Sequence, residues 1–282
     1  MPLITSPQNP RVKEAARLRD RRHRQKQGRI LIDGAREISR AIRAGVRVLE
    51  AFVCEPLCTS DEARHLLGLL DKCGGEMLQV TEPVFEKLAF GHRTEGVLAV
   101  AEMPPARELS QLAFNEDKTV PLVAVLEGVE KPGNVGAVLR SADAAGVSAV
   151  IVADACTDLY NPNAIRASLG TIFTMPICET NGGDALTWLR QRNFTILAAR
   201  VDGSVAYTEV DFRGPTAIVL GSEVQGLSPI WSASEIRAIR LPMCGVADSL
   251  NVSVTAAVLF YEARRQREGS GIRDQGSEAR GT

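Results

Sequence analysis

Short apolar runs alternate with segments of helical periodicity along most of the chain, and this alternation limits the fold more than any other feature. In the N-terminal part, apolar runs stand at residues 29–32, 48–54, 77–80 and 97–101, with helical patterns at 35–44, 61–72 and 81–88. Strands that alternate with helices predict an α/β fold. We therefore expect a small α/β domain over residues 28–103, preceded by a basic arm over residues 1–27.

A break in this pattern divides the chain. Pro104, Pro105 and a polar stretch up to Thr119 interrupt all periodicity, which predicts a linker over residues 104–119. A length of 282 residues suits two domains, and the second should occupy residues 120–267. Its apolar runs, at 122–126, 149–153, 196–199 and 217–220, are nearly continuous, as in a mostly parallel sheet with helices on both faces.

The C-terminal segment predicts a closing helix over residues 250–267. Its apolar residues fall on one helical face, namely Leu250, Val254, Ala257, Val258 and Tyr261. The polar residues 268–282 that follow predict a disordered tail.

Composition excludes several classes of protein. The hydrophobic content of 45% can fill real cores, but no apolar run reaches the roughly 18 residues of a membrane span. The first ten residues lack the apolar stretch of a secretory signal, so we expect a cytoplasmic protein. The six scattered cysteines predict reduced thiols. Cys54, Cys58, His65 and Cys73 match no common zinc spacing, so we expect no metal.

The net charge of −1 hides a strongly basic N-terminal arm. Only Glu14 and Asp20 oppose its nine cations, which are Arg11, Lys13, Arg17, Arg19, Arg21, Arg22, Arg24, Lys26 and Arg29. Such a cluster can exchange counterions with a phosphate backbone, which favours a nucleic-acid partner. A solvated helix face with no partner explains the charge equally well.

Three loops of the second domain could carry chemistry, because ligands of parallel sheets bind at the carboxyl ends of strands. The first, residues 127–146, contains Asn134 at the expected start of a helix and Arg140 nearly two turns later. An Asn cap followed by a surface Arg is the structural alternative. The loop lacks the Lys and Ser/Thr of a P-loop and the third glycine of a dinucleotide fingerprint, so neither ATP nor NAD binding is supported.

The other two loops lie later in the second domain. In residues 218–228, Gly221 ends an apolar strand and would let backbone approach a ligand, and Glu223 follows at once. In residues 241–254, Ser249 can cap the closing helix and Asn251 lies in its first turn. A turn with a solvated Glu and an ordinary helix cap are the alternatives.

These three loops, in this order, resemble the motifs of the SpoU (TrmH-like) family of RNA ribose methyltransferases in the SPOUT superfamily. The resemblance covers residues 120–266, and residues 28–101 resemble the small RNA-binding α/β module, similar to a ribosomal protein, that precedes many members. It implies a trefoil-knotted sheet, a homodimer, and S-adenosylmethionine bound in the knot. The expected activity is methyl transfer to a ribose 2'-hydroxyl of structured RNA, with rRNA favoured over tRNA.

The resemblance also assigns roles to residues. The polar active-site positions fall on Asn134, Arg140, Glu223, Ser249 and Asn251. The cofactor positions, which act mainly through backbone and apolar contacts, fall on Leu220, Gly221, Leu241, Met243 and Leu250. Arg166, in a segment that resembles one near the substrate, is the expected phosphate contact, and Arg22 and Arg24 of the arm are further RNA-binding candidates.

Three positions depart from the family pattern. Val224 stands where the family often has Gly, which narrows the room beside the cofactor. Thr255 replaces a common Ala, and Glu95 replaces a common Gln in the first domain, which bears on the RNA target more than on chemistry.

The reaction must align two atoms and help a weakly acidic hydroxyl lose its proton. His23, His65 and His92 all lie in the first domain, so the family's Arg140 is the candidate, either as a transient base or as a stabiliser of the developing alkoxide. The rival interpretation is a dimeric RNA-binding protein whose methyltransferase domain has lost activity. A nucleotide-dependent enzyme of small metabolites explains neither the basic arm nor the motifs.

Overall fold

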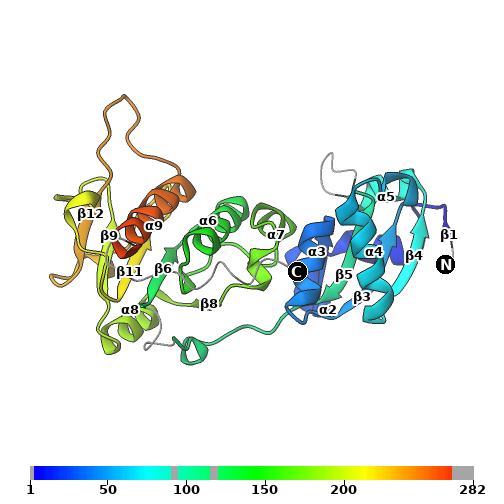
Figure 1. Ribbon diagram of the computed structural model, residues 1–282, viewed down its shortest axis with the longest axis horizontal. Coiled ribbons are helices and arrows are strands. Elements are labelled where there is room, and N and C mark those ends of the chain that lie inside the picture. Colours follow the sequence, from blue (N-terminus) through cyan, green and yellow to red (C-terminus); the bar gives the residue numbers. More distant parts are fainter. Residues whose placement is uncertain (1–2, 90–94, 115–119, 269–282) are drawn as a thin grey trace. The chain divides into compact units, whose positions relative to one another are not determined.

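The computed structural model describes residues 3–89, 95–114 and 120–268 (Figure 1). The expected tail, apart from residue 268, lies outside them, as does His92. Contacts divide the chain into two compact units. The first comprises the residues up to Pro105 together with 135–137 and 157–174, and the second comprises the remainder. None of the described helices is long and apolar enough to cross a membrane.

The first unit is built on a five-stranded sheet of order β1-β4-β3-β5-β2. Its strands are β1 (Leu3–Ile4), β2 (Arg29–Asp33), β3 (Val48–Val53), β4 (Glu76–Val80) and β5 (Val97–Glu102). Its helices are α3 (Ala35–Arg43), the 3-10 turn η1 (Glu55–Leu57), α4 (Asp61–Cys73) and α5 (Glu82–Leu88). Strand β5 is antiparallel to both of its neighbours, and the other pairs are parallel. The expected strands and helices are all present.

The basic arm forms two short helices, α1 (Pro10–Arg17) and α2 (Arg21–Gln27). The Asp20 carboxylate accepts a hydrogen bond from the backbone N–H of Arg22 at 2.7 Å, so it caps α2 and separates the two helices. Gly28 ends α2 in the left-handed conformation, with a φ of 61°, as its position predicts.

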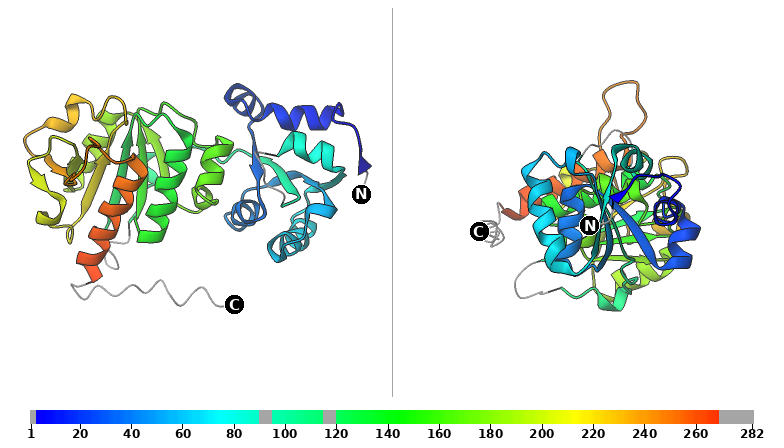
Figure 2. Two further views of the ribbon diagram at one scale, coloured as in Figure 1. Left: turned by 90° about the horizontal axis from the view of Figure 1, so that it is seen from above. Right: turned by 90° about the vertical axis from the view of Figure 1, so that its right-hand side faces the viewer.

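The second unit contains a seven-stranded sheet of order β10-β12-β9-β11-β6-β7-β8, and every strand pair in it is parallel. The strands are β6 (Leu122–Glu127), β7 (Ala149–Ala153), β8 (Ile177–Thr180), β9 (Thr195–Ala199), β10 (Val205–Ala206), β11 (Thr216–Leu220) and β12 (Arg237–Arg240). The helices are α6 (Pro132–Ala145), α8 (Gly182–Gln191) and α9 (Val252–Glu268), with 3-10 turns η2 (Leu109–Gln111), η4 (Tyr207–Glu209) and η5 (Pro229–Ser232). Helices α6 and α9 cover the side of this sheet that faces the viewer in the left view of Figure 2, and α8 covers the other side (Figure 1). The prediction of an α/β fold with a mostly parallel sheet is confirmed.

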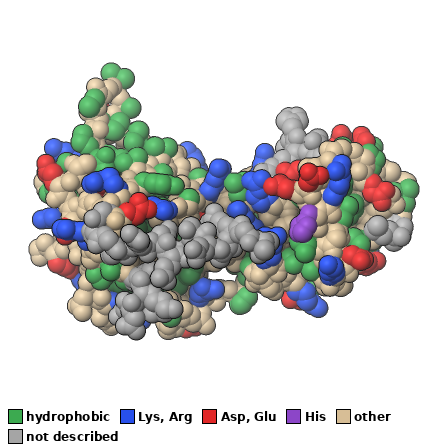
Figure 3. All heavy atoms as spheres, in the orientation of Figure 1, with side chains coloured by type: hydrophobic (Ala, Val, Ile, Leu, Met, Phe, Trp, Pro, Cys, Tyr) green, Lys and Arg blue, Asp and Glu red, His purple; other side chains and the backbone are tan. Residues whose placement is uncertain are grey.

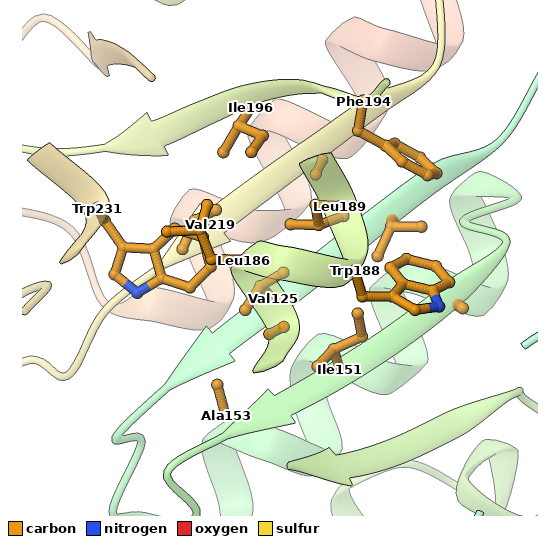
Figure 4. Close-up of a cluster of buried hydrophobic side chains, with 14 of the residues drawn as sticks. Val125, Ile151, Ala153, Leu186, Trp188, Leu189, Phe194, Ile196, Val219 and Trp231 are labelled. Atoms are coloured by element: carbon orange, nitrogen blue, oxygen red, sulfur yellow. The ribbon is translucent and has the colours of Figure 1, made fainter. Parts of the chain in front are cut away.

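Alternate side chains of the central strands fill a core on each face. On one face Val125, Ile151 and Val219 pack against α8, between the rings of Trp188 and Trp231 (Figure 4). On the other, the even-numbered residues of β6 and β11 are equally buried. Near-continuous apolar strands are buried on both faces for this reason.

Part of the expected linker belongs to this core. Leu112 is buried in it, Leu109 packs against it, and the Phe114 ring contacts Trp188 edge-on with 5.9 Å between centroids. The linker expected over residues 104–119 therefore includes a segment with a defined packing role.

A short segment between β7 and β8 packs with the first unit. It contains α7 (Pro162–Ala167) and the 3-10 turn η3 (Thr171–Phe173). Asp158, just before α7, accepts a hydrogen bond from Arg24 Nε at 2.9 Å, and the carbonyl of Leu169 accepts one from Arg40 at 2.7 Å. This segment of the predicted second domain, residues 157–174, thus belongs to the first unit. The sequence pattern did not predict these contacts.

Candidate active site

The loops at the carboxyl ends of β9, β11 and β12 enclose a cavity of about 970 Å³ in the second unit. Its walls come from residues 199–202, 220–227, 239–243 and the segment that leads into α9. These loops meet because the carboxyl ends of parallel strands lie at one edge of a sheet. The cavity therefore occupies the place where such a sheet binds ligands.

All five residues expected to hold a cofactor line this cavity, namely Leu220, Gly221, Leu241, Met243 and Leu250. A Cβ atom on Gly221 would lie 2.5 Å from the backbone carbonyl of Gly226, so only glycine lets the loop fold back this closely. The backbone N–H of Gly226 in turn donates a hydrogen bond to the carbonyl of Ser222 at 2.9 Å. The loop is thus a tight turn whose backbone faces the cavity.

Three of the predicted polar residues form one hydrogen-bonded cluster beside the cavity. Oε1 of Glu223 accepts hydrogen bonds from the side-chain amides of Asn134, at 2.6 Å, and Asn251, at 2.8 Å. The Asn251 amide also lies 3.3 Å from Oδ1 of Asn134. Lys131 adds a positive charge, with its Nζ 3.8 Å from Oε2 of Glu223. The start of α6, the loop after β11 and the start of α9 therefore meet at one carboxylate.

Asn251, rather than Ser249, caps the last helix. Its Oδ1 accepts from the backbone N–H of Ser253 at 2.9 Å and from the Ser253 hydroxyl at 2.6 Å. The helix begins at Val252, two residues later than predicted, so Asn251 stands outside the first turn and Ser249 lies beyond capping range. Ser249 is instead exposed at the cavity wall.

Arg140 does not join this cluster. It is exposed on α6, does not line the cavity, and makes no hydrogen bond or ion pair within the part of the chain that the structure describes. Its guanidinium is therefore free to meet a group from outside the unit.

The sequence patterns missed a charged pair at the cavity wall. Arg200 and Asp202 follow β9 and make two parallel hydrogen bonds, each 2.8 Å long, and Arg200 also donates to the Ser232 hydroxyl at 2.6 Å. The hydrogen bonds from Arg200 lower the pKa of Asp202, and the same contact raises the pKa of Arg200. Their position after an apolar strand at the same sheet edge was the signal that could have found them.

The arm residues differ from one another in exposure. Arg24 is 1% exposed, and its guanidinium donates to the carbonyls of Leu18 and Arg19 as well as to Asp158. This burial contradicts its predicted role in RNA binding, because a fully paired interior guanidinium cannot reach a phosphate. Arg22 is exposed, and Arg166 is half-buried in α7.

A hollow of about 420 Å³ in the arm had not been predicted. It is lined by Arg17, His23, Lys26 and Arg29, with Gln27 and the opposing charge of Glu14. Among the described residues, none of its three Arg and Lys side chains makes an ion pair. An anion is the natural occupant of such a surface.

The three departures from the family pattern have distinct positions. Val224 is 80% exposed and lines the cavity at its rim, and Thr255 lines it from α9. Glu95 accepts a hydrogen bond from the backbone N–H of Ala35 at 2.8 Å, so its carboxylate serves the start of α3, where Gly34 has no side chain to do so.

The closing helix α9 is apolar on two faces. Val252, Ala256, Leu259, Phe260 and Ala263 are buried against the unit. On the predicted face, Leu250, Val254 and Tyr261 remain 39%, 47% and 51% exposed. The loop between β12 and α9, orange in Figure 1, also carries apolar side chains on its surface (Figure 3).

Comparison with known proteins identifies the family. The model of the SpoU rRNA Methylase family matches residues 121–261, and that of an MRM3-like substrate binding domain matches residues 9–99. The chain belongs to the SpoU rRNA methylase family. Among relatives of this SpoU protein, the 23S rRNA (uridine(2479)-2'-O)-methyltransferase of Streptomyces viridochromogenes is 32% identical, over 89% of this chain and 88% of its own length. The 23S rRNA (guanosine(2553)-2'-O)-methyltransferase RlmP of Bacillus subtilis is 27% identical, over 94% of this chain and all of its own length.

Solved structures agree with this assignment. An RNA 2'-O ribose methyltransferase is 42% identical to this SpoU protein, with a TM-score of 0.82, over 94% of this chain and 99% of the other. AviRb of Streptomyces viridochromogenes, in complex with the cofactor AdoMet, is 28% identical with a TM-score of 0.80, over 93% of this chain and 99% of the other.

Proposed function

We propose that this SpoU protein transfers the methyl group of S-adenosylmethionine to a ribose 2'-hydroxyl of ribosomal RNA. The observation that carries the proposal is the hydrogen-bonded cluster of Asn134, Glu223 and Asn251, whose Glu223 lines a cavity at the sheet's carboxyl edge. The rRNA 2'-O-methyltransferase relatives and the AdoMet complex of AviRb support the substrate and the cofactor. A ribosomal RNA substrate implies that the protein works in the cytoplasm.

The cavity fits this cofactor. Its volume lies within the range of about 300–1,000 Å³ that is usual for small-molecule sites, and its apolar wall of Leu220, Leu241 and Leu250 suits an adenine ring. Glu223 and Asp248 supply carboxylates around the same space, in addition to Asp202, which Arg200 pairs, and this suits a positively charged sulfonium. When bound, S-adenosylmethionine supplies an electrophilic methyl group on that sulfur.

The residues of the cluster hold the Glu223 carboxylate in one orientation. Asn134 and Asn251 fix Oε1 of Glu223, which keeps a negative charge beside the cavity without letting the carboxylate turn. Arg140 carries a guanidinium, a group that is a poor proton acceptor but a good partner for negative charge. We therefore assign it the stabilisation of the developing alkoxide, with solvent taking the proton. Arg140 remains the proposed catalytic residue, and Ser249 a proposed polar contact at the wall.

The arm and the first unit would hold the RNA. Arg17, Lys26 and Arg29 surround the hollow beside α2, and Arg22 is exposed nearby in sequence. Cations without carboxylate partners can neutralise phosphates, which is the main source of affinity for nucleic acid. They take over the role first given to Arg24. Arg166 remains a proposed phosphate contact.

We also propose a homodimer through the exposed face of α9. Val254 and Tyr261 stand on it, Leu250 stands just before it, and Val246 in the preceding loop is fully exposed. An apolar helix face of this kind is typical of an interface between subunits. The face on which the sequence pattern predicted apolar residues is thus the one left for a partner.

The test is to measure S-adenosylmethionine binding by calorimetry and methyl transfer to rRNA with the purified chain. Arg140→Ala should reduce transfer by at least a hundredfold while the Kd for S-adenosylmethionine stays within about threefold. Arg213→Ala, at another exposed arginine, is the matched control and should leave both unchanged. Wild-type protein that binds no S-adenosylmethionine would sink the proposal and favour a purely RNA-binding role.

A further inference from the structure

Glu127 is a buried carboxylate that the proposed chemistry does not use. It ends β6, the strand next to β11, and its side chain is 5% exposed. Its two oxygens accept three hydrogen bonds, each 2.7 Å long. Oε2 accepts from the backbone N–H of Ser228, and Oε1 accepts from the Ser228 hydroxyl and from the indole N–H of Trp231.

No Lys or Arg pairs with this carboxylate among residues 3–89, 95–114 and 120–268, so hydrogen bonds and a helix terminus must compensate its charge. The N-terminus of α8 lies beside it, since a Cβ on Gly182 would stand 3.1 Å from Oε1 of Glu127. The same Cβ would stand 2.9 Å from Oδ2 of Asp154, which accepts the Gly182 N–H. Glycine is what lets the positive end of α8 approach both carboxylates.

The partners of Glu127 stand at the end of the cavity loop. Residues 221–227 line the cavity and carry Glu223, and Ser228 follows them directly. Strand β11 holds the first end of this loop through its pairing with β6 and β9. The second end leads into η5, whose Trp231 is buried in the core against the sheet, and Glu127 adds the hydrogen bonds that tie Ser228 to the central strand β6.

We propose that Glu127 is a positioning residue, which holds the cavity loop in the shape that binds the cofactor. Charge-assisted hydrogen bonds to a backbone N–H fix both the distance and the direction of Ser228. The loop between two fixed ends keeps the backbone of Gly221 and the carboxylate of Glu223 in place before a ligand arrives. Such preorganisation lowers the cost of binding. This inference rests on the proposed use of S-adenosylmethionine.

The decisive variant is Glu127→Gln, which keeps the size of the side chain. Its single carbonyl can still accept from two donors, but its amide NH₂ then faces the Ser228 N–H, donor against donor. In the full-length protein we expect the Kd and the KM for S-adenosylmethionine to rise about tenfold, with kcat at saturation reduced less than threefold. The Kd for RNA should be unchanged.

Trp231→Phe is the matched control, because it removes one donor to Glu127 but leaves Ser228 tied to it. It should lower the melting temperature yet keep the Kd for S-adenosylmethionine within about twofold. Should Glu127→Gln fail to fold, Ser228→Ala carries the test, with about threefold weaker binding that Ser228→Thr restores. The inference would be overturned if Glu127→Gln bound S-adenosylmethionine as tightly as Trp231→Phe does. The same outcome for Ser228→Ala would overturn it where that variant takes the place of Glu127→Gln. That result, with the wild-type protein binding normally, leaves the proposed function intact.

Discussion

Gly133 and Gly136, which lie on either side of Asn134 on α6, should respond in opposite ways to substitution by alanine. A Cβ on Gly136 of α6 would lie 2.3 Å from the carbonyl oxygen of Ala164 and 2.7 Å from the Cβ of Ala167, both on α7. A Cβ on Gly133 would meet nothing within 4 Å. Helix propensity alone favours alanine at either position, by up to about 1 kcal/mol.

At Gly136 the clash costs more free energy than the higher helix propensity of alanine contributes. Two of its neighbours are backbone atoms, since the Ser168 nitrogen lies at 2.9 Å, and backbone cannot rotate away as a side chain can. Overpacking of this kind costs about 1–3 kcal/mol, and contacts this short place the cost at the upper end. Gly136→Ala should therefore lower the free energy of unfolding by about 2 kcal/mol net, whereas Gly133→Ala should raise it by about 0.5 kcal/mol.

Urea unfolding monitored by circular dichroism measures both changes. For a chain of this size, about 2 kcal/mol corresponds to a fall of roughly 4–8 °C in melting temperature. Because α6 also carries Asn134, a displaced helix should reduce methyl transfer by Gly136→Ala as well. Equal stabilities for the two variants, or a Gly136→Ala protein more stable than wild type, would show that α6 and α7 do not approach this closely.

Two further predictions concern surfaces. Val254→Asp places a charge on the exposed face of α9 and should shift the protein toward monomer in sedimentation velocity, whereas Leu3→Asp, at another exposed apolar residue, should not; a monomeric wild type would contradict the proposed dimer. Arg17→Gln and Lys26→Gln should each reduce the slope of log Kd for RNA against log salt concentration by about 1. Arg47→Gln, whose cation is paired with Glu102, is the control, and unchanged slopes for the first two would place the RNA elsewhere.

The strongest sequence signals predicted elements well. The buried strands β6, β7, β9 and β11 stand where apolar runs stood, because a strand buried on both faces has no polar positions to blur its pattern. Strands β8, β10 and β12 were missed. They are short, β8 and β10 lie at the edges of the sheet, and β8 and β12 mix charged with apolar residues. Such a pattern does not differ from that of a loop.

Arg24 shows why charge patterns alone mislead. In sequence it is one of nine cations in the arm, and nothing distinguishes it from Arg22. The difference arises from Asp158, which lies 134 positions away and pairs with it only in the folded chain. Exposure of a cation depends on where the acidic partners come to lie, so the arm's charge predicted a basic surface but not which residues form it.

Sequence patterns selected Asn134, Glu223 and Asn251, which lie together in the structure, but they predicted neither the hydrogen bonds among these residues nor the charged pair of Arg200 and Asp202. Each loop taken alone had a structural explanation, and the helix cap expected at Ser249 is made instead by Asn251. Its Oδ1 serves the cap while its amide donates to Glu223, so the cap and the cluster use opposite ends of one side chain. A residue whose two ends are both engaged fixes the start of α9 relative to the cavity loop. For this reason the structural and the functional interpretations of Asn251 are not alternatives, and removing its amide while keeping its oxygen, as in Asn251→Asp, would set a second carboxylate against Glu223 and disturb the site but not the helix.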